Sequence, residues 1–379
     1  MTERSFLPET PEQLSAAWLS TLFDGEINSV EQRVLGAGVG FMGDVVRLEL
    51  SSGSADVPRY LIAKLPKLEN RVVGELLGVY EREIMFFREF GDDLPIRAPR
   101  LYFSEFDRDR GSENQKPIIR ALDRLPGFMN GLLAWAAMRA AGAKERRYLL
   151  LIEYYEDMQP GDQLVGIDAA ACGNVLQEVA ALHRRYWADA SLQDHFWLME
   201  LDIDARMRQG SLRRHSESYL KRLEPSVAGH IEWLRKHTSE LVFAFCAQAP
   251  TTLLHGDLRL DNLVFSEEGC AFLDFQMVRS GPAAYDLAYF ISSALDEHAT
   301  AEERDDILRQ YHAALNIADY DFDSLRRDYA RAVMIVFATL AGNDDVQIDD
   351  GRGSEMMEGW LRRLCACVKA VDLDSLLDR

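Results

Sequence analysis

Three polar side chains in one short stretch of the sequence have types and an order that could do chemistry together. Asp257 is followed by Asn262 and then by Asp274. Magnesium prefers hard oxygen ligands and keeps part of its water, while a separate carboxylate can accept the proton of an attacking hydroxyl. These residues therefore predict a phosphoryl-transfer site, with Asp257 as the base and Asn262 and Asp274 as magnesium ligands. The alternative is that His255-Gly-Asp is a tight turn and that the other two are ordinary polar groups of a hairpin.

The elements that flank these residues would bring them together. Two short apolar runs, 263–265 and 270–273, are separated by turn formers and predict a β-hairpin. Closing that turn places Asn262 opposite Leu273, so that Asn262 and Asp274 emerge at the same open end. The candidate base lies on the loop that enters this end.

A glycine-rich loop near the N-terminus is the next candidate. Gly38, Gly40 and Gly43 fit the spacing Gly-x-Gly-x-x-Gly, which lets backbone amides close over phosphates. A dinucleotide site requires a helix after these glycines, whereas a kinase-type loop requires a second strand. Residues 44–50 alternate as a strand does, and residues 59–64 return as another. The sequence therefore favours the kinase-type loop.

A lysine and a glutamate further along could complete a phosphate site. Lys64 ends the strand Leu-Ile-Ala-Lys, which is close to the Val-Ala-Ile-Lys of kinases. Residues 80–90 then predict a helix, on which Glu83 directly precedes the apolar stripe and could pair with Lys64. Glu81 is the competing partner. Either glutamate could instead lie on a solvated helix face, and the lysine could be an exposed residue at a strand end.

The order of elements predicts two lobes and a connector. We expect a nucleotide-binding lobe over residues 1–154, a connector over 155–159, and a helical catalytic and substrate-binding lobe over 160–379. The backbone around Glu156 and Met158 could hydrogen-bond the edge of an adenine.

Three features lack a chemical role in this scheme. Residues 108–147 have no clean assignment: a polar loop is followed by an apolar, alanine-rich helix at 128–141. This segment could pack on the first lobe, which is the default, lie over a substrate entrance, or contact a partner. His183 shares an apolar helix face and is expected to be a packing residue. Asp286 is expected either to cap its helix or to brace the loop that carries Asp257.

Composition excludes some classes of partner. The chain has 62 acidic and 42 basic residues, a net charge of −20, which argues against binding to nucleic acid or to an anionic membrane surface. The longest apolar run, 332–342, is too short for the ~20 residues of a membrane-spanning helix, and the N-terminus lacks a signal-peptide core. The five scattered cysteines indicate reduced thiols and a cytoplasmic protein. Oligomeric state is not indicated.

Taken in chain order, these motifs resemble the kinase-like phosphotransferases of small molecules, the aminoglycoside phosphotransferase and choline kinase superfamily. The stretches HGDLRLDN, FLDFQ, YDLAYFI, ALHRRYW and MQPGDQLVG are most similar to its ecdysteroid-kinase-like branch. The resemblance spans residues 34–295. It implies an α+β, protein-kinase-like fold of two lobes: a small lobe with a five-stranded antiparallel sheet and one key helix, and a larger, mainly helical lobe that forms the acceptor pocket.

The resemblance also implies roles for single residues. It makes Asp257 the base and Lys64 a phosphate contact held by Glu83, and Arg259 could neutralise charge on the transferring phosphoryl group. Gln276 stands where protein kinases carry glycine, and no long activation segment follows, so a protein substrate is not expected.

The function expected from the sequence is an ATP- and magnesium-dependent kinase that phosphorylates a hydroxyl group of a small molecule. The branch resemblance and the aromatic residues of the second lobe favour a lipophilic alcohol, such as a steroid-like or hydroxyacyl compound. The alternative is a kinase-like nucleotide-binding or regulatory protein without activity, which the intact Lys64, Asp257, Asn262 and Asp274 argue against.

Overall fold

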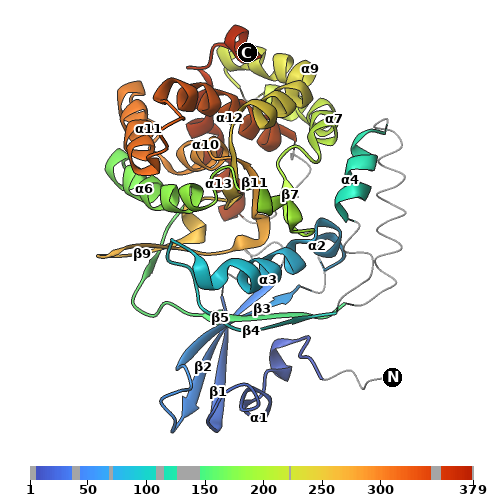
Figure 1. The fold of residues 1–379 in the computed structure, drawn as a ribbon, viewed down its shortest axis with the longest axis vertical. Coiled ribbons are helices and arrows are strands. Elements are labelled where there is room, and N and C mark those ends of the chain that lie inside the picture. The colour runs from blue at the N-terminus through green and yellow to red at the C-terminus, as the bar shows by residue number, and fades with distance from the viewer. Residues whose placement is uncertain are drawn as a thin grey trace. The chain divides into compact units, whose positions relative to one another are not determined.

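The chain folds into two compact units of helices and strands (Figure 1). The computed structural model describes residues 6–35, 43–67, 71–107, 115–125, 146–221, 223–342 and 351–377. The first unit is formed from residues 1–94, 98–112 and 132–158, and the second from residues 95–97, 113–131 and 159–379. The units therefore interleave along the chain, whereas the predicted lobes do not.

The first unit is built on one antiparallel sheet. Its strands are β1 (Ile27–Leu35), β2 (Gly43–Ser52), β3 (Tyr60–Pro66), β4 (Leu101–Phe106) and β5 (Tyr148–Glu153), in the spatial order β1-β2-β3-β5-β4. The predicted five-stranded antiparallel sheet is confirmed. β2 and β3 form the hairpin expected after the glycine loop, and Val45 lies opposite Lys64.

The two faces of this sheet have different environments because side chains alternate along each strand. On one face, alternate residues of β2 and β3 form a core with the N-terminal segment, which contains η1 (Pro11–Gln13) and α1 (Ala16–Leu19). Lys64 has the opposite parity to the buried Ala63 and Leu65. Next along the chain come α2 (Arg71–Leu77), α3 (Val79–Phe90) and η2 (Gly91–Asp93), and α3 packs on β4 and β5.

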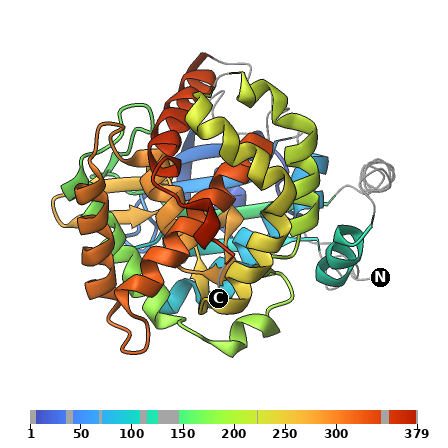
Figure 2. The ribbon, with the colours of Figure 1, turned by 90° about the horizontal axis from the view of Figure 1, so that it is seen from above.

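The second unit is mainly helical. The helix α12 is buried along most of its length, and α10 packs against both α12 and α13, while α11 packs on α6 (Figures 1 and 2). The helices are α4 (Gln115–Asp123), α6 (Ala169–Arg185), α7 (Ala205–His215), α8 (Glu217–Leu220), α9 (Pro225–Gln248), α10 (Ala284–Ala294), α11 (Ala301–Leu315), α12 (Phe322–Gly342) and α13 (Gly351–Val368). Short turns are η4 (Ala190–Asp194), η5 (Leu260–Asn262), η6 (Phe275–Met277) and η7 (Leu373–Ser375).

Two small sheets in this unit hold the stretch with the candidate catalytic residues. One contains β6 (Gln159–Pro160), β9 (Leu263–Ser266) and β10 (Gly269–Phe272), and the other contains β7 (Met199–Glu200), β8 (Thr251–Leu254) and β11 (Arg279–Pro282). The predicted hairpin is confirmed: Cys270 lies opposite Phe265, and the N–H of Leu273 donates to the carbonyl oxygen of Asn262 at 2.8 Å.

Part of the unassigned segment 108–147 is now accounted for. Helix α4 packs on α7, where Asp123 accepts hydrogen bonds from the backbone N–H groups of Arg206 and Met207, both at 2.8 Å. Lys116 pairs with Glu200 at 3.3 Å. The sequence predicted a polar loop before residue 128, and α4 lies there instead, with its polar anchors in the second unit. The predicted helix at 128–141 falls on residues outside the described part of the chain. Residues 108–114 and 126–145 lie outside the described residues.

A buried carboxylate fixes the loop 255–262 that joins β8 to β9. Asp286, on the first turn of α10, accepts the backbone N–H groups of His255 at 2.7 Å and of Gly256 at 2.9 Å. Gly256 has a φ of 79°, and a side chain at this position would collide with the carbonyl oxygen of Met277. Only glycine therefore gives both amides the same direction without strain. The expectation that Asp286 braces this loop is confirmed.

Further groups hold Asp286 from behind. The Nε2 atom of His183 lies 3.3 Å from its carboxylate, and the Nδ1 atom lies 2.8 Å from the hydroxyl of Tyr311. A neutral imidazole that carries its proton on Nε2 satisfies both contacts, because the tyrosine hydroxyl then donates to Nδ1. All three side chains are fully buried. The expectation that His183 is a packing residue is confirmed, and its ring nitrogens contact the polar groups of Asp286 and Tyr311.

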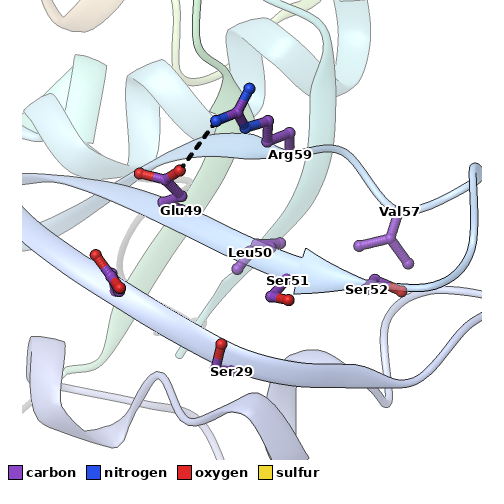
Figure 3. Close-up of a pocket in the computed structure, with 8 residues that line it drawn as sticks. Ser29, Glu49, Leu50, Ser51, Ser52, Val57 and Arg59 are labelled. Atoms are coloured by element: carbon purple, nitrogen blue, oxygen red, sulfur yellow. Dashed lines mark hydrogen bonds and ion pairs between the residues drawn. The ribbon is translucent and has the colours of Figure 1, made fainter.

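A shallow polar groove lies on the first unit, lined by paired residues of β1 and β2 and by Val57 and Arg59 of the loop that follows β2 (Figure 3). Its volume is about 410 Å³, and an ion pair of 3.4 Å between Arg59 and Glu49 borders it. It contains none of the predicted site residues. No helix among the described residues is long and apolar enough to cross a membrane.

We predict that Asp286→Asn lowers the free energy of unfolding by about 2 kcal/mol, because an amide cannot accept both backbone N–H groups in the same way as a carboxylate. Urea denaturation monitored by tryptophan fluorescence measures the change. The matched control is Asp305→Asn on α11, where a partly exposed carboxylate pairs with Arg309 and Arg326. That change should cost less than about 1 kcal/mol. Equal losses in the two variants would contradict the bracing role.

Candidate active site

The carboxylate of Asp257 is held by side chains from its own loop and from α10. The Nδ2 atom of Asn262 donates to Oδ2 at 2.8 Å and also to the backbone oxygen of Asp257 at 2.8 Å. The hydroxyl of Tyr289 donates to Oδ1 at 2.6 Å. The side chain of Asp257 remains 20% exposed, so it can still be reached by a molecule from solution.

The orientation of Asn262 makes a metal-ligand role possible. Because its amide nitrogen contacts two acceptor oxygens, its amide oxygen points away from Asp257. A hard amide oxygen of this kind suits magnesium. Within the described part of the chain, no group of three or more His, Cys, Asp or Glu side chains could hold a metal ion.

Asp274 follows the hairpin and has an unusual backbone. Its φ of 61° and ψ of 72° lie in the left-handed region, which costs energy for a residue with a side chain. Such strain concentrates at functional sites, where the surrounding structure imposes it. The preceding residue, Leu273, is tied on both sides: its N–H bonds to Asn262, and its carbonyl oxygen accepts a hydrogen bond from Nε2 of His255 at 2.9 Å. The two predicted magnesium ligands thus leave the same end of the hairpin.

The ring of His255 connects the loop that carries Asp257 with the end of the hairpin at Leu273. Its Nε2 donates to the carbonyl oxygen of Leu273, and its Nδ1 accepts the backbone N–H of Asp257 at 3.4 Å. The ring is fully buried and lies tilted against Phe275, with centroids 4.9 Å apart. His255 therefore positions the loop.

Arg259 lies beside the candidate base. Its Nε atom is 3.4 Å from Oδ2 of Asp257, and its Nη1 atom is 3.1 Å from Asp261 and 3.5 Å from the sulfur of Met356. Burial acts to lower the pKa of this guanidinium, but Asp257, Tyr289 and the other nearby acids outweigh it, so the pKa lies above its usual value. The site therefore contains a permanent positive charge next to the carboxylate.

The segment after β6 that contains Gln163, here called the strap, contacts the loop 255–262. Its structural part in the site was not predicted from the sequence. Gln163 is buried, its side-chain oxygen accepts the backbone N–H of Leu260 at 2.8 Å, and its side-chain nitrogen donates to the carbonyl oxygen of Ser293. Arg363 of α13 donates to the carbonyl oxygens of Gln163 and Ser293 at 2.8 and 2.9 Å. The only signal for the strap in the sequence was the wording MQPGDQLVG.

The first unit contains the predicted phosphate contact. Nζ of Lys64 lies 2.6 Å from Oε1 of Glu83, and both side chains are largely buried, at 14% and 3% exposure. Glu81 instead lies 3.9 Å from Arg146. The choice of Glu83 over Glu81 as the partner of Lys64 is therefore confirmed. Neither residue of the pair is an exposed surface group.

The remaining nucleotide-site predictions are only partly covered by the structure. Gly38 and Gly40 lie outside the described residues. Gly43 begins β2, where a side chain would come within 2.9 Å of the carbonyl oxygen of Leu65. Glu156 is half exposed and lies 3.8 Å from Arg59, and Met158 is buried. Their roles toward a nucleotide stay predictions.

Solved structures with a similar fold are phosphotransferases. Macrolide 2'-phosphotransferase MphH from Brachybacterium faecium has 15% identity and a TM-score of 0.51, with 93% of this chain and 97% of that chain covered. Spectinomycin phosphotransferase APH(9)-Ia, solved with ADP and spectinomycin, has 11% identity and a TM-score of 0.51, with 96% and 99% covered. Plasmodium vivax ethanolamine kinase Pv091845 has 12% identity and a TM-score of 0.50, with 92% and 85% covered.

At these identities the likeness concerns the fold, and it confirms the predicted kinase-like α+β fold. A search of curated protein sequences found no match. The profile of the family APH, described as "Phosphotransferase enzyme family", matches residues 100–326, more than half of the chain. This chain therefore belongs to the phosphotransferase enzyme family.

Proposed function

We propose that this phosphotransferase transfers the γ-phosphoryl group of ATP to a hydroxyl group of a small molecule, and that magnesium is required. The observation that carries the proposal is the carboxylate of Asp257, which is partly exposed and held by Asn262, with the cation of Arg259 beside it. Phosphoryl transfer depends mainly on positioning and charge neutralisation, and these groups supply both.

In the proposed reaction Asp257 accepts the proton of the acceptor hydroxyl. The acceptor oxygen forms a bond to the γ-phosphorus, the bond from this phosphorus to the bridging oxygen breaks, and ADP leaves with the electron pair. Arg259 neutralises charge that develops on the transferring group. The proton then leaves Asp257 to solvent, which restores the carboxylate.

Asn262 and Asp274 are the proposed protein ligands of magnesium. A bound magnesium ion would neutralise the phosphate charge and orient the leaving group. The amide orientation of Asn262, whose nitrogen binds Asp257, supports this role, as does the strained backbone of Asp274.

Lys64 is the proposed contact to the α and β phosphates, with Glu83 holding it in place. We propose that the glycine loop, with Gly38, Gly40 and Gly43, closes over the phosphates and that the backbone near Glu156 and Met158 contacts the adenine. Structures of similar fold that were solved with ADP or AMP-PNP support a nucleotide as the phosphoryl donor.

For the acceptor we propose a lipophilic alcohol, in line with the resemblance to the ecdysteroid-kinase-like branch. Two partly exposed side chains, Tyr289 and Met356, lie next to Asp257 and Arg259 and offer apolar surface there. The similar solved structures are named for a macrolide, spectinomycin and ethanolamine, so the fold alone does not choose among acceptors. The five cysteines are free, which supports a reducing compartment such as the cytoplasm.

We predict that ATP and magnesium together raise the thermal unfolding midpoint, because a ligand that binds only the folded chain stabilises it. At nucleotide concentrations 100-fold above the dissociation constant the gain is about 2.7 kcal/mol. Differential scanning fluorimetry with ATP alone, magnesium alone and both measures it. No shift at millimolar MgATP would contradict the nucleotide site, and a shift without transfer to any acceptor would favour the inactive nucleotide-binding protein.

We predict that Asp257→Asn lowers the rate of transfer by about 10²- to 10⁴-fold while leaving ATP binding nearly intact, because only the proton acceptor is lost. Asp274→Ala should instead abolish magnesium-dependent nucleotide binding. A coupled assay of ADP formation with a panel of alcohols gives the rates, and titration calorimetry gives the affinities. Full turnover by the Asp257 variant would overturn the assignment of the base.

We predict that Glu83→Gln raises the KM for ATP about 10-fold, the effect of losing one charged hydrogen bond that holds Lys64. The control is Glu81→Gln on the same helix, which should change this KM by less than about twofold because Glu81 pairs with Arg146 instead. Steady-state kinetics at saturating acceptor separates the two. An equal rise in both variants would indicate general disturbance of α3 and contradict the specific role.

A further inference from the structure

Tyr289 has a contact that the family motifs do not explain. Its hydroxyl donates to Oδ1 of Asp257 at 2.6 Å, the shortest of the hydrogen bonds to that carboxylate. Tyr289 lies in the stretch YDLAYFI, a point of resemblance to the family that assigns this tyrosine no role. A hydroxyl directly on the proposed base must influence how that base meets its substrate.

The contacts of the two carboxylate oxygens differ. Oδ2 of Asp257 receives Nδ2 of Asn262 at 2.8 Å and Nε of Arg259 at 3.4 Å. Among the described residues, Oδ1 receives only the hydroxyl of Tyr289. Each carboxylate oxygen accepts about two hydrogen bonds. The open acceptor position is therefore on Oδ1, beside the tyrosine hydroxyl.

Helix α10 fixes this hydroxyl in register with the loop. Asp286 and Tyr289 are three residues apart on α10 and thus lie on the same face. Asp286 holds the backbone of the loop, and Tyr289 holds the carboxylate that the loop carries. Helix α10 therefore sets both the backbone position of Asp257 and the orientation of its carboxylate.

Packing from α13 keeps the tyrosine ring in place. The ring of Trp360 meets that of Tyr289 edge to face, with centroids 4.9 Å apart, and its indole nitrogen lies 3.4 Å from the hydroxyl of Ser292 on α10. Burial, and then the adjacent Asp257, raise the pKa of Tyr289 well above its usual value. The hydroxyl thus keeps its proton and can act only as a donor toward the carboxylate.

We propose that Tyr289 is a positioning residue for phosphoryl transfer: its hydrogen bond orients the Asp257 carboxylate so that the remaining lone pair of Oδ1 takes the proton of the acceptor. This inference rests on the proposed function and deepens it, because it names the reacting oxygen atom. The acceptor hydroxyl then binds next to the tyrosine hydroxyl, on the side of the site formed by α10.

The test compares Tyr289→Phe with Tyr285→Phe in the full chain. Both changes remove one hydroxyl from α10, but Tyr285 lies one turn earlier, with ring centroids 6.0 Å apart, and has no hydrogen bond to Asp257. The reaction is release of phosphate from MgATP with water as the acceptor. For Tyr289→Phe we expect kcat to fall about 10- to 100-fold with the KM for ATP changed less than about twofold. Tyr285→Phe should match the wild type in both.

A double-mutant cycle separates positioning of the base from general structural support. If Tyr289 acts through Asp257, adding Tyr289→Phe to Asp257→Asn should not slow the residual reaction further. Additive losses would overturn the inference, as would a wild-type kcat in Tyr289→Phe. If Asp257→Asn itself keeps the wild-type rate, it is the proposed function that fails.

A spectroscopic measurement tests the contact without turnover. In protein labelled with ¹³C at the aspartate side-chain carboxyl, the Asp257 signal is identified by its loss in Asp257→Asn. This signal should move in Tyr289→Phe and stay in place in Tyr285→Phe, at fixed pH. An unchanged signal in Tyr289→Phe overturns the positioning role whatever the rates are.

Discussion

The candidate site depends on one interaction: the buried carboxylate of Asp286 accepts hydrogen bonds from two backbone N–H groups. A buried charge is stable only when hydrogen bonds satisfy it, and here the N–H groups of His255 and Gly256 do so, with His183 behind. The positive φ of Gly256 lets both amides face one carboxylate. This pairing sets the start of the loop between β8 and β9, and the contacts from His255 and Gln163 hold the rest of it.

Several elements besides Asp286 support the loop 255–262. Helix α10 supports the loop on one side, the strap with Gln163 supports its backbone at Leu260, and Arg363 of α13 ties strap and helix together through the carbonyl oxygen of Ser293. Sites held to within fractions of an ångström need such supporting contacts on rigid elements. The hydrogen bonds to the candidate base are thus supported by further hydrogen bonds, from Gln163 and Arg363, that hold the surrounding backbone.

Local patterns in the sequence were sufficient for the hairpin and for the Lys64–Glu83 pair. The turn spacing determined which residues oppose each other, and the position of Glu83 directly before the apolar stripe of α3 indicated which glutamate pairs with Lys64. Tyr289 and Gln163 could not be assigned in this way, because their partners are distant in the sequence and are chosen by helix packing. Helix α4 was missed for the same reason: the contacts of Asp123 with the start of α7 leave no periodic signal in the sequence.

The interleaving of the two units has a consequence for how this protein folds. Strands β4 and β5 are neighbours in one sheet, yet the chain between them includes α4, which is anchored on α7 by contacts from Asp123 to residues far downstream. A nascent chain that ends soon after β5 would contain α4 without its anchor. Because the polypeptide returns to the first unit only after it has contributed to the second, neither unit can be excised as one uninterrupted fragment. The first unit ends at residue 158, whereas the second, which includes the α7 anchor of α4, needs the residues that follow.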